Sequence, residues 1–235
     1  DGHKPEIKDG TTAETVAAEA RTRPFVVTAA RTGNRRKGAP APFTTSTLQQ
    51  EAAKQYGFSA KRTMRAAQRL YEGVDTPDGH VGLITYMRTD STAMAGVAMG
   101  EAREVIAGRF GAPYTMPRGR VHKTKAKGAQ EAHESVRPTS FHRDPESLRS
   151  HLKAEELKLY RLIWTRFVAS QMAPALFDQT TVEVVAPGAD NLKYLFRATG
   201  TVPKFDGFLA VYQEGKDTKD EEDEELKHKL PAVTQ

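Results

Sequence analysis

Both ends of the chain carry short stretches rich in apolar and β-prone residues. "PFVVTAA" at 24–30 is one, and "DQTTVEVVA" at 178–186, "LKYLFRATGTV" at 192–202 and "GFLAVYQ" at 207–213 follow near the other end. A hydrophobic period of two places the apolar side chains on one face of a β-strand. The turn-forming "PGADN" at 187–191 separates two of these stretches, so we predict consecutive antiparallel strands.

The middle of the chain changes to helical spacing. Ser46 and Gln49 stand in capping-box spacing and predict the start of a helix, which Gly57 should end. Ser59 and Gly73 bracket a second helix in the same way. The two helices are close together in the sequence, as in a helix-turn-helix unit.

The second of these helices has two different faces. Met64, Ala67, Leu70 and Tyr71 recur at helical spacing and are predicted to pack inward. The outer face collects four basic residues, which are Lys61, Arg62, Arg65 and Arg69. A basic helix face of this kind is a candidate DNA-binding surface.

Three more helices and one strand are predicted between these and the C-terminal strands. "GLITY" at 82–86 is short and β-prone, and a helix should run from about residue 92 to Phe110. Asp144, with a proline after it, begins a short helix. The stretch 154–172 is a strongly amphipathic helix, whose predicted buried residues are Leu159, Ile163, Trp164 and Phe167.

The order of strand, helices and strands predicts an α+β fold. A mostly helical domain at 39–173 would be inserted into a β-rich domain formed by residues 1–38 and 174–235.

The charge is unevenly distributed over the 235 residues. The net charge is +5, but residues 214–229 hold eight acids against four lysines, which leaves +9 for the rest. Residues 39–173 contain twenty Lys and Arg against thirteen Asp and Glu. Such a surplus attracts polyanions, so nucleic acid is the leading partner, although ordinary solubilising surface charge remains open. The acidic run at 217–225 is interpreted as a solvated surface segment.

Several classes of function are excluded by what the sequence lacks. There is no cysteine, hence no disulfide or thiolate chemistry, and no apolar run long enough to cross a membrane. No Gly-rich phosphate loop, HExxH, spaced acidic set or Ser-His-Asp arrangement is apparent. We therefore expect a soluble, cytoplasmic protein that is neither a complete nuclease nor a kinase.

The stretch "GLITYMRTDST" at 82–92 carries the strongest candidate chemistry. If it is extended, Tyr86 and Arg88 point the same way. A tyrosine oxygen can attack phosphorus when positive charge stabilises the transition state, and a guanidinium can hold a phosphate beside it. The alternative is a packed tyrosine followed by a surface charge.

A second candidate lies in "QEAHESVRPT" at 130–139. His133 and Arg137 are four residues apart, so a helical turn would place both on one face, where they could bind neighbouring phosphates. A capped loop with a satisfied histidine is the alternative.

Five consecutive blocks together resemble the bacterial type IA DNA topoisomerases, specifically the topoisomerase I branch. "YMRTDS" is closer to that branch than to topoisomerase III, which usually has proline where Met87 stands. The blocks are "APFTTSTLQQEA" at 41–52, "AQRLYEG" at 67–73, "GLITYMRTDST" at 82–92, "QEAHESVRPT" at 130–139 and "LYRLIWTRFVASQM" at 159–172.

The resemblance implies a role for each matched residue. Tyr86 would be the nucleophile that forms a 5′-phosphotyrosyl bond with one DNA strand, and Arg88 would position the scissile phosphate. His133 would bind phosphate at the same site, while Asp90 and Ser91 would have capping and positioning roles. The family opens one strand, passes the other through the gap and reseals it, which relaxes negative supercoils without ATP.

The resemblance also implies what this chain lacks. The family binds Mg²⁺ in a TOPRIM domain that is not recognisable here, so we expect no metal site in this chain. The chain would comprise the catalytic-tyrosine domain, with its winged-helix-like fold, and the β-rich arch domain around it. Its partners would be a single-stranded segment of supercoiled DNA and the remaining domains, in the bacterial cytoplasm at the nucleoid. Alone it should bind DNA but be inactive.

Two other hypotheses remain open. The chain could be a non-enzymatic winged-helix-type DNA-binding module that docks on phosphates through helix 59–72 and loop 118–127. It could also be a partner-binding β domain with a helical insert. One local departure from the family is the long loop at 74–80 before the tyrosine.

Overall fold

The computed structural model describes residues 7–122, 133–188 and 193–215. It divides into two compact units. The described part of the first comprises residues 7–35, 177–188 and 193–204, and that of the second comprises 36–122, 133–176 and 205–215. We call them the β unit and the helical unit.

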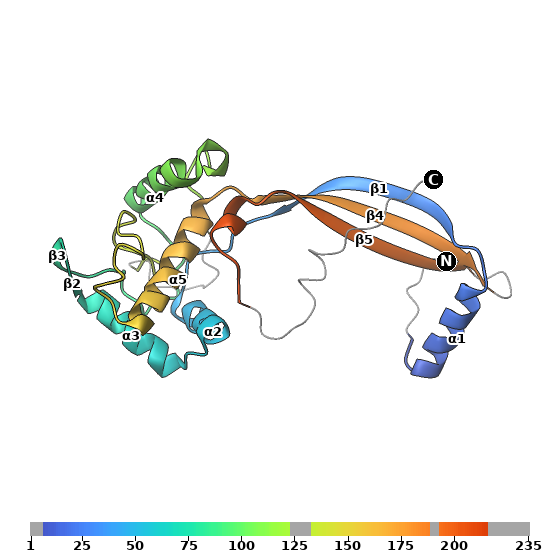
Figure 1. Cartoon of the computed structure of the whole chain (residues 1–235), viewed down its shortest axis with the longest axis horizontal. Helices are drawn as coiled ribbons and strands as arrows, with labels where there is room; N and C mark the ends of the chain where they lie inside the picture. Colours follow the sequence, from blue (N-terminus) through green and yellow to red (C-terminus); the bar gives the residue numbers. More distant parts are fainter. Residues whose placement is uncertain (1–6, 123–132, 189–192, 216–235) are drawn as a thin grey trace. The chain divides into compact units, whose positions relative to one another are not determined.

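The β unit is a three-stranded sheet with one helix. It contains helix α1 (Gly10–Arg21) and strands β1 (Val26–Lys37), β4 (Ala175–Pro187) and β5 (Lys193–Phe205), and the ends of the strands continue into the helical unit. The strand order is β1-β4-β5, and the three strands run side by side in Figure 1.

Cross-strand side-chain contacts show that β4 and β5 are antiparallel. Lys204 pairs with Asp178, and Arg197 pairs with Glu183 further along β4, so residue numbers rise on one strand as they fall on the other. The antiparallel strands predicted at 178–186 and 192–202 are therefore confirmed. The strand predicted at 24–30 extends further than expected, to Lys37, through a basic stretch that holds no proline to interrupt it.

The helical unit is built around one long central helix. Its elements are α2 (Thr45–Tyr56), α3 (Ala60–Glu72), β2 (Val74–Thr76), β3 (Gly79–Val81), α4 (Gly96–Phe110) and α5 (Ala154–Gln171), with short 3-10 helices at Ala112–Tyr114 and Gly207–Ala210. Helix α5 packs against α2, α3 and α4, which surround it in Figure 1.

The core of this unit confirms the amphipathic helix predicted at 154–172. All four residues expected to be buried are no more than 4% exposed. Trp164 donates its indole N–H to the Phe141 carbonyl at 3.2 Å, and Phe141 stacks on Phe167 with ring centroids 4.6 Å apart. Aromatic burial of this kind dominates the stability of a small core.

The ends of α2 and α3 lie close to the predicted positions, with one correction. Gly57 ends α2 in the left-handed region at φ 65°, and the Ser59 side chain caps α3. The capping box of α2, however, is formed by Thr44 and Thr47, so the prediction of Ser46 and Gln49 is wrong. The helix begins earlier, which puts Thr47 at the position that reaches back to the cap.

Three other predicted elements are also corrected. The loop at 74–80 is an antiparallel hairpin, with Val74 opposite Val81 around a tight turn. The helix expected from residue 92 begins at Gly96, and no side chain caps it. After Asp144 the chain forms turns rather than a helix, although the Asp144 carboxylate accepts hydrogen bonds from two following backbone amides.

Residues 205–215 pack in the helical unit, whereas we had assigned 174–235 to the β-rich domain. The predicted strand at 207–213 is instead a 3-10 turn followed by an irregular segment. Phe208 and Tyr212 are 2% and 3% exposed, and the Phe208 amide donates to the Ala173 carbonyl. Gly207 is required there, because a Cβ would lie 2.5 Å from that same carbonyl and φ is +51°.

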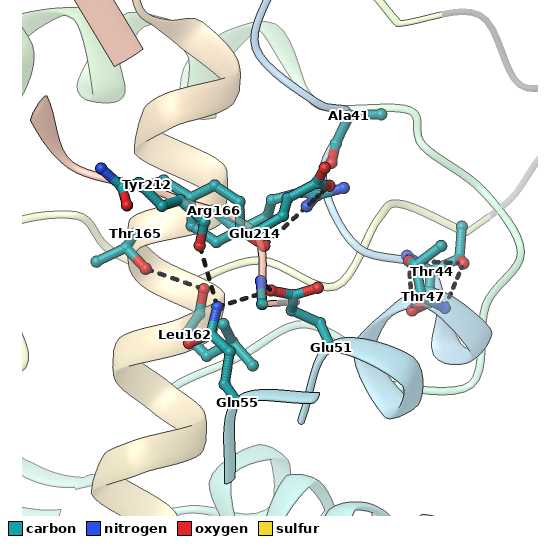
Figure 2. A network of polar contacts seen from close by, with 12 residues as sticks. Ala41, Thr44, Thr47, Glu51, Gln55, Leu162, Thr165, Arg166, Tyr212 and Glu214 are labelled. Atoms are coloured by element: carbon teal, nitrogen blue, oxygen red, sulfur yellow. Dashed lines mark hydrogen bonds and ion pairs between the residues drawn. The ribbon is translucent and has the colours of Figure 1, made fainter. Parts of the chain in front are cut away.

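A buried arginine fastens this returning segment (Figure 2). Arg166 of α5 donates to the Ala41 carbonyl at 2.6 Å and to Tyr212 Oη and Glu214 Oε1, both at 2.8 Å. Its guanidinium also lies over the ring of Phe43. Nearby, Glu51 accepts hydrogen bonds from the Gln55 side chain and the Gly215 amide. We call this set of contacts the Arg166 network.

Candidate active site

Residues 82–92, which we call the tyrosine segment, are not a strand of a sheet, and the backbone bends at Thr85 and Met87. Only an isolated bridge joins Ile84 to Pro138. The Leu83 amide donates to the Leu70 carbonyl at 2.7 Å, and the Thr139 amide donates to the Leu83 carbonyl at 3.0 Å. The predicted strand at 82–86 is therefore replaced by an irregular segment held between the end of α3 and residues 136–139.

Side chains alternate between outside and inside along this segment. Tyr86, Arg88 and Asp90 are exposed, whereas Met87, Thr89 and Ser91 are buried. Tyr86 and Arg88 are thus exposed at alternate positions of the segment, although bends at Thr85 and Met87 interrupt the extended backbone that the sequence predicted.

Two threonines position the segment from below. Thr45, the first residue of α2, donates its hydroxyl to the Met87 carbonyl at 2.7 Å, and its Oγ1 accepts from the Thr89 amide. Thr85 donates its hydroxyl to the Ser135 carbonyl at 2.7 Å and accepts from the Arg137 amide. The sequence analysis missed both residues, because isolated threonines in a hydroxyl-rich stretch give no signal beyond local capping.

Two aromatic rings flank the Tyr86 side chain, which is 38% exposed. Tyr71 approaches edge-on with ring centroids 5.4 Å apart, and the His133 ring lies at 5.7 Å. The structure therefore brings together Tyr86 and His133, which are 47 positions apart in the sequence. Among the described residues, no side chain accepts a hydrogen bond from the Tyr86 hydroxyl, so none is identified as its base.

The predicted burial of Tyr71 is wrong. We predicted that it packs inward with Leu70, yet it is 41% exposed whereas Leu70 is fully buried. Tyr71 lies at the end of α3, where the last turn presents it to the tyrosine segment rather than to α5. Helical spacing alone does not identify where a buried face stops.

His133 and Arg137 do not share a helical turn. Residues 133–138 are extended, with Val136 bridged to Phe43, so the predicted helical face is wrong. Arg137 forms an ion pair with Glu134 and donates to the Pro138 carbonyl at 2.9 Å. Its side chain is only 13% exposed. Its backbone amide donates to the Thr85 hydroxyl oxygen, so Arg137 helps to hold the segment that carries Tyr86.

Ser91 does not cap helix α4, which begins at Gly96 without a side-chain cap. Its hydroxyl oxygen instead accepts from the Ala93 amide at 3.0 Å, two residues along the chain. Asp90 is exposed.

The basic face predicted on α3 is partly neutralised by the start of α5. Arg62 pairs with Glu155 at 2.6 Å, and Arg69 pairs with Glu156 at 3.2 Å. The hydrogen bond from Arg62 lowers the pKa of Glu155, which keeps that carboxylate charged. The other two members of this face, Lys61 and Arg65, are exposed.

Two regions named in the sequence analysis fall partly or wholly outside the described residues. Of loop 118–127, the structure describes residues up to His122. There Gln171 clamps the Arg120 backbone, accepting from its amide at 2.9 Å and donating to its carbonyl at 3.0 Å. The acidic run at 217–225 lies outside the described residues.

No group of three or more histidines and carboxylates is arranged to hold a metal ion in the described ranges. No helix in that part of the chain is long and apolar enough to cross a membrane.

Comparison with known proteins gives a consistent result. The family model described as DNA topoisomerase matches residues 1–235. Two curated proteins, each named DNA topoisomerase 1 and each from a strain of Xylella fastidiosa (Temecula1 and 9a5c), are 49% identical over 204 residues. The match covers 86% of this chain and 24% of each relative.

A solved structure agrees with these relatives. The chain resembles full-length topoisomerase I from Thermotoga maritima in its monoclinic crystal form, with a TM-score of 0.70 and 36% identity. That match covers 94% of this chain and 35% of the other. The chain thus spans about a quarter of the length of the curated relatives it matches. With its tyrosine segment, mixed helical and antiparallel architecture and full-length family match, the chain belongs to the bacterial type IA DNA topoisomerases.

Proposed function

We propose that this chain supplies the nucleophile of a type IA topoisomerase that relaxes negatively supercoiled DNA. The observation that supports this most directly is the exposure of Tyr86 and Arg88 at alternate positions of one segment, with the His133 ring 5.7 Å from that of Tyr86. The family membership supports it independently.

In the proposed reaction, the Tyr86 oxygen attacks a backbone phosphorus of single-stranded DNA. A bond forms from Tyr86 Oη to phosphorus, and the bond from phosphorus to the 3′ oxygen breaks. The phenol loses its proton and the departing 3′ oxygen gains one, which leaves a 5′-phosphotyrosyl bond and a free 3′ hydroxyl. Resealing reverses these steps after the other strand has passed, and because the covalent bond conserves the phosphodiester energy, no ATP is needed.

Arg88 and His133 would stabilise this transfer. A guanidinium offers two parallel N–H groups to a phosphate, and its fixed charge is matched to the negative charge that grows on the phosphoryl oxygens. His133, whose ring centroid lies 5.7 Å from that of Tyr86, would donate to another oxygen of the same phosphate.

Other parts of the molecule would have supporting roles. Helices α2 and α3 with the β2–β3 hairpin follow one another in the order of a winged-helix unit, which we propose this region to be. The β unit would belong to the arch. Mg²⁺ would be held by a TOPRIM domain outside this chain, and we assign no step to it here. The partners of this chain would be the remaining domains of the enzyme and a single-stranded segment of DNA. The enzyme would act in the cytoplasm, at the nucleoid.

A trapping experiment tests this function. The chain is incubated with end-labelled single-stranded DNA, alone and with a separately produced TOPRIM-containing polypeptide and Mg²⁺. A covalent adduct should form only in the complemented mixture, and Tyr86→Phe should abolish it without weakening DNA binding. Tyr194→Phe, which changes a tyrosine of the β unit, is the matched control and should leave the adduct intact.

The competing function is a DNA-binding module without chemistry, favoured by the exposure of Lys61 and Arg65 on α3. It predicts that replacing both by alanine weakens DNA binding strongly. It also predicts no adduct in any mixture, even when association of the two polypeptides has been shown. Adduct formation by the chain alone would contradict our proposal that its catalytic groups are divided between two parts of an enzyme.

A further inference from the structure

The helical unit exposes two aromatic rings side by side. Among its described residues, Tyr71 and Tyr86 are the most exposed of the Phe, Tyr and Trp residues, at 41% and 38%. Tyr71 lies at the end of α3 and Tyr86 lies in the tyrosine segment, and their ring centroids are 5.4 Å apart. The proposed chemistry uses Tyr86 and gives Tyr71 no role.

The backbone holds Tyr71 at a fixed place relative to Tyr86. The Tyr71 carbonyl lies so close to Gly82 that a Cβ on that glycine would come within 2.7 Å of the oxygen. One residue on, the Leu83 amide donates to the Leu70 carbonyl at 2.7 Å. The end of α3 and the start of the tyrosine segment are therefore in direct contact.

Burial accounts for only part of the Tyr71 side chain. Its ring contacts that of Tyr86, which is itself exposed, and Tyr71 keeps 41% of its surface in contact with water. The adjacent acid, Glu72, accepts a hydrogen bond from Gln68 one turn back at 2.6 Å. Arg88, two residues from Tyr86 in the sequence, is exposed and has no ion pair among the described residues.

We propose that Tyr71 is a stacking platform for an unpaired nucleobase that flanks the phosphate bound at Tyr86. The inference rests on the proposed function, because attack requires the phosphorus to lie about 3–3.5 Å from the Tyr86 oxygen. A base next to that phosphate then lies within one nucleotide of Tyr86. The Tyr71 ring, whose centroid is 5.4 Å from that of Tyr86, is also within this distance. Exposed aromatic rings beside positive charge are the usual means of binding single strands.

The test measures binding without chemistry. The parent is the 235-residue chain with Tyr86→Phe, which keeps the ring and removes the nucleophile. Its affinity for single-stranded oligonucleotides is measured by anisotropy at low salt, and Tyr71→Ala and Tyr71→Phe are compared on this background. Phe25→Ala is the matched control, since it removes a ring that is 52% exposed from the β unit.

We expect the ring, and not the hydroxyl, to matter. Tyr71→Ala should weaken binding about 5- to 150-fold, the effect of losing one stacked base, while Tyr71→Phe and Phe25→Ala should leave it unchanged. The fluorescent base 2-aminopurine, placed at successive positions, should be quenched at one position by the parent and by Tyr71→Phe but not by Tyr71→Ala. An abasic nucleotide there should weaken the parent and have no further effect on Tyr71→Ala.

The outcomes separate this inference from the function on which it rests. If the parent binds and Tyr71→Ala binds equally well, the platform is refuted and the proposed function stands. If Tyr71→Phe is as weak as Tyr71→Ala, the hydroxyl is responsible and stacking is refuted. If the parent does not bind single strands at all, DNA binding by this chain is refuted and the platform with it. Fluorescence of Trp164, buried in the core, checks that each variant is folded.

Discussion

Replacing Arg166 by methionine should lower the free energy of unfolding of the helical unit by about 2–4 kcal/mol. Methionine keeps the aliphatic length of the side chain but removes the charge and all its donors. In the Arg166 network the Ala41 carbonyl and the Tyr212 hydroxyl would each lose a partner, and a buried group left without one costs about 1–3 kcal/mol. Glu214 adds little, because its side chain is 58% exposed and returns to water.

The protein contains a built-in probe for this measurement. Trp164 is the sole tryptophan of the sequence and is 4% exposed in the core of the helical unit. Its fluorescence during urea titration therefore follows this unit and not the β unit. The slope of free energy against urea should be unchanged in the variant while the midpoint falls.

Glu214→Gln is the matched control for the charge. It keeps the shape of the acceptor and should change the free energy of unfolding by less than about 1 kcal/mol, as expected for an exposed ion-pair partner. A loss below about 1 kcal/mol in Arg166→Met as well would refute the reasoning, because it would mean that segment 205–215 is held by Phe208 and Tyr212 packing alone.

Three further predictions concern single positions of the helical unit. Burial raises the pKa of Tyr160, so its contribution to stability is present below about pH 10 and is lost as the pH rises further. Tyr160→Phe should therefore make the decline of stability above pH 10 less steep. Trp164 fluorescence follows this decline. Gly207→Ala should cost about 2 kcal/mol or more in chemical denaturation, because φ is +51° and its Cβ would strike backbone, whereas Gly96→Ala, with open space around it, should be neutral. Gly82→Ala should reduce the yield of covalent adduct in the complemented mixture more than Gly96→Ala does, because its Cβ would push against the Tyr71 carbonyl; equal yields would show that this contact does not position Tyr86.

The elements that the sequence predicted well are those whose signals are local. Helix α3 begins after Ser59 and ends before Gly73, because a side-chain oxygen caps one end and a glycine turns the other. Helix α5 was recognisable from its apolar stripe alone, although the structure buries more than that stripe, since every residue from Arg166 to Gln171 is buried. Such signals need no knowledge of the rest of the chain.

The errors arise where partners far apart in the sequence decide the structure. "GLITY" is β-prone, but it is held by Leu70 and by residues 136–139 instead of a neighbouring strand. Phe208 and Tyr212 are four residues apart. This spacing fits one face of a strand, and it also fits a 3-10 turn followed by an irregular segment, with both side chains packed on the core. The buried surface available around α5 decided between them.

The same argument applies to the charges, and it bears on where DNA would approach. The sequence gives Arg62, Arg69 and Arg137 the same formal charge as Arg88, but it does not reveal their partners. In the folded chain Glu155, Glu156 and Glu134 compensate the first three, while Arg88 has no ion pair among the described residues. A phosphate that displaced a glutamate would lose the energy of the existing pair and leave a carboxylate nearby, whereas a phosphate at Arg88 faces neither cost. The basic surplus therefore favours encounter with DNA in general, and the unpaired Arg88, two residues from Tyr86, is a better site for a phosphate than Arg62, Arg69 or Arg137.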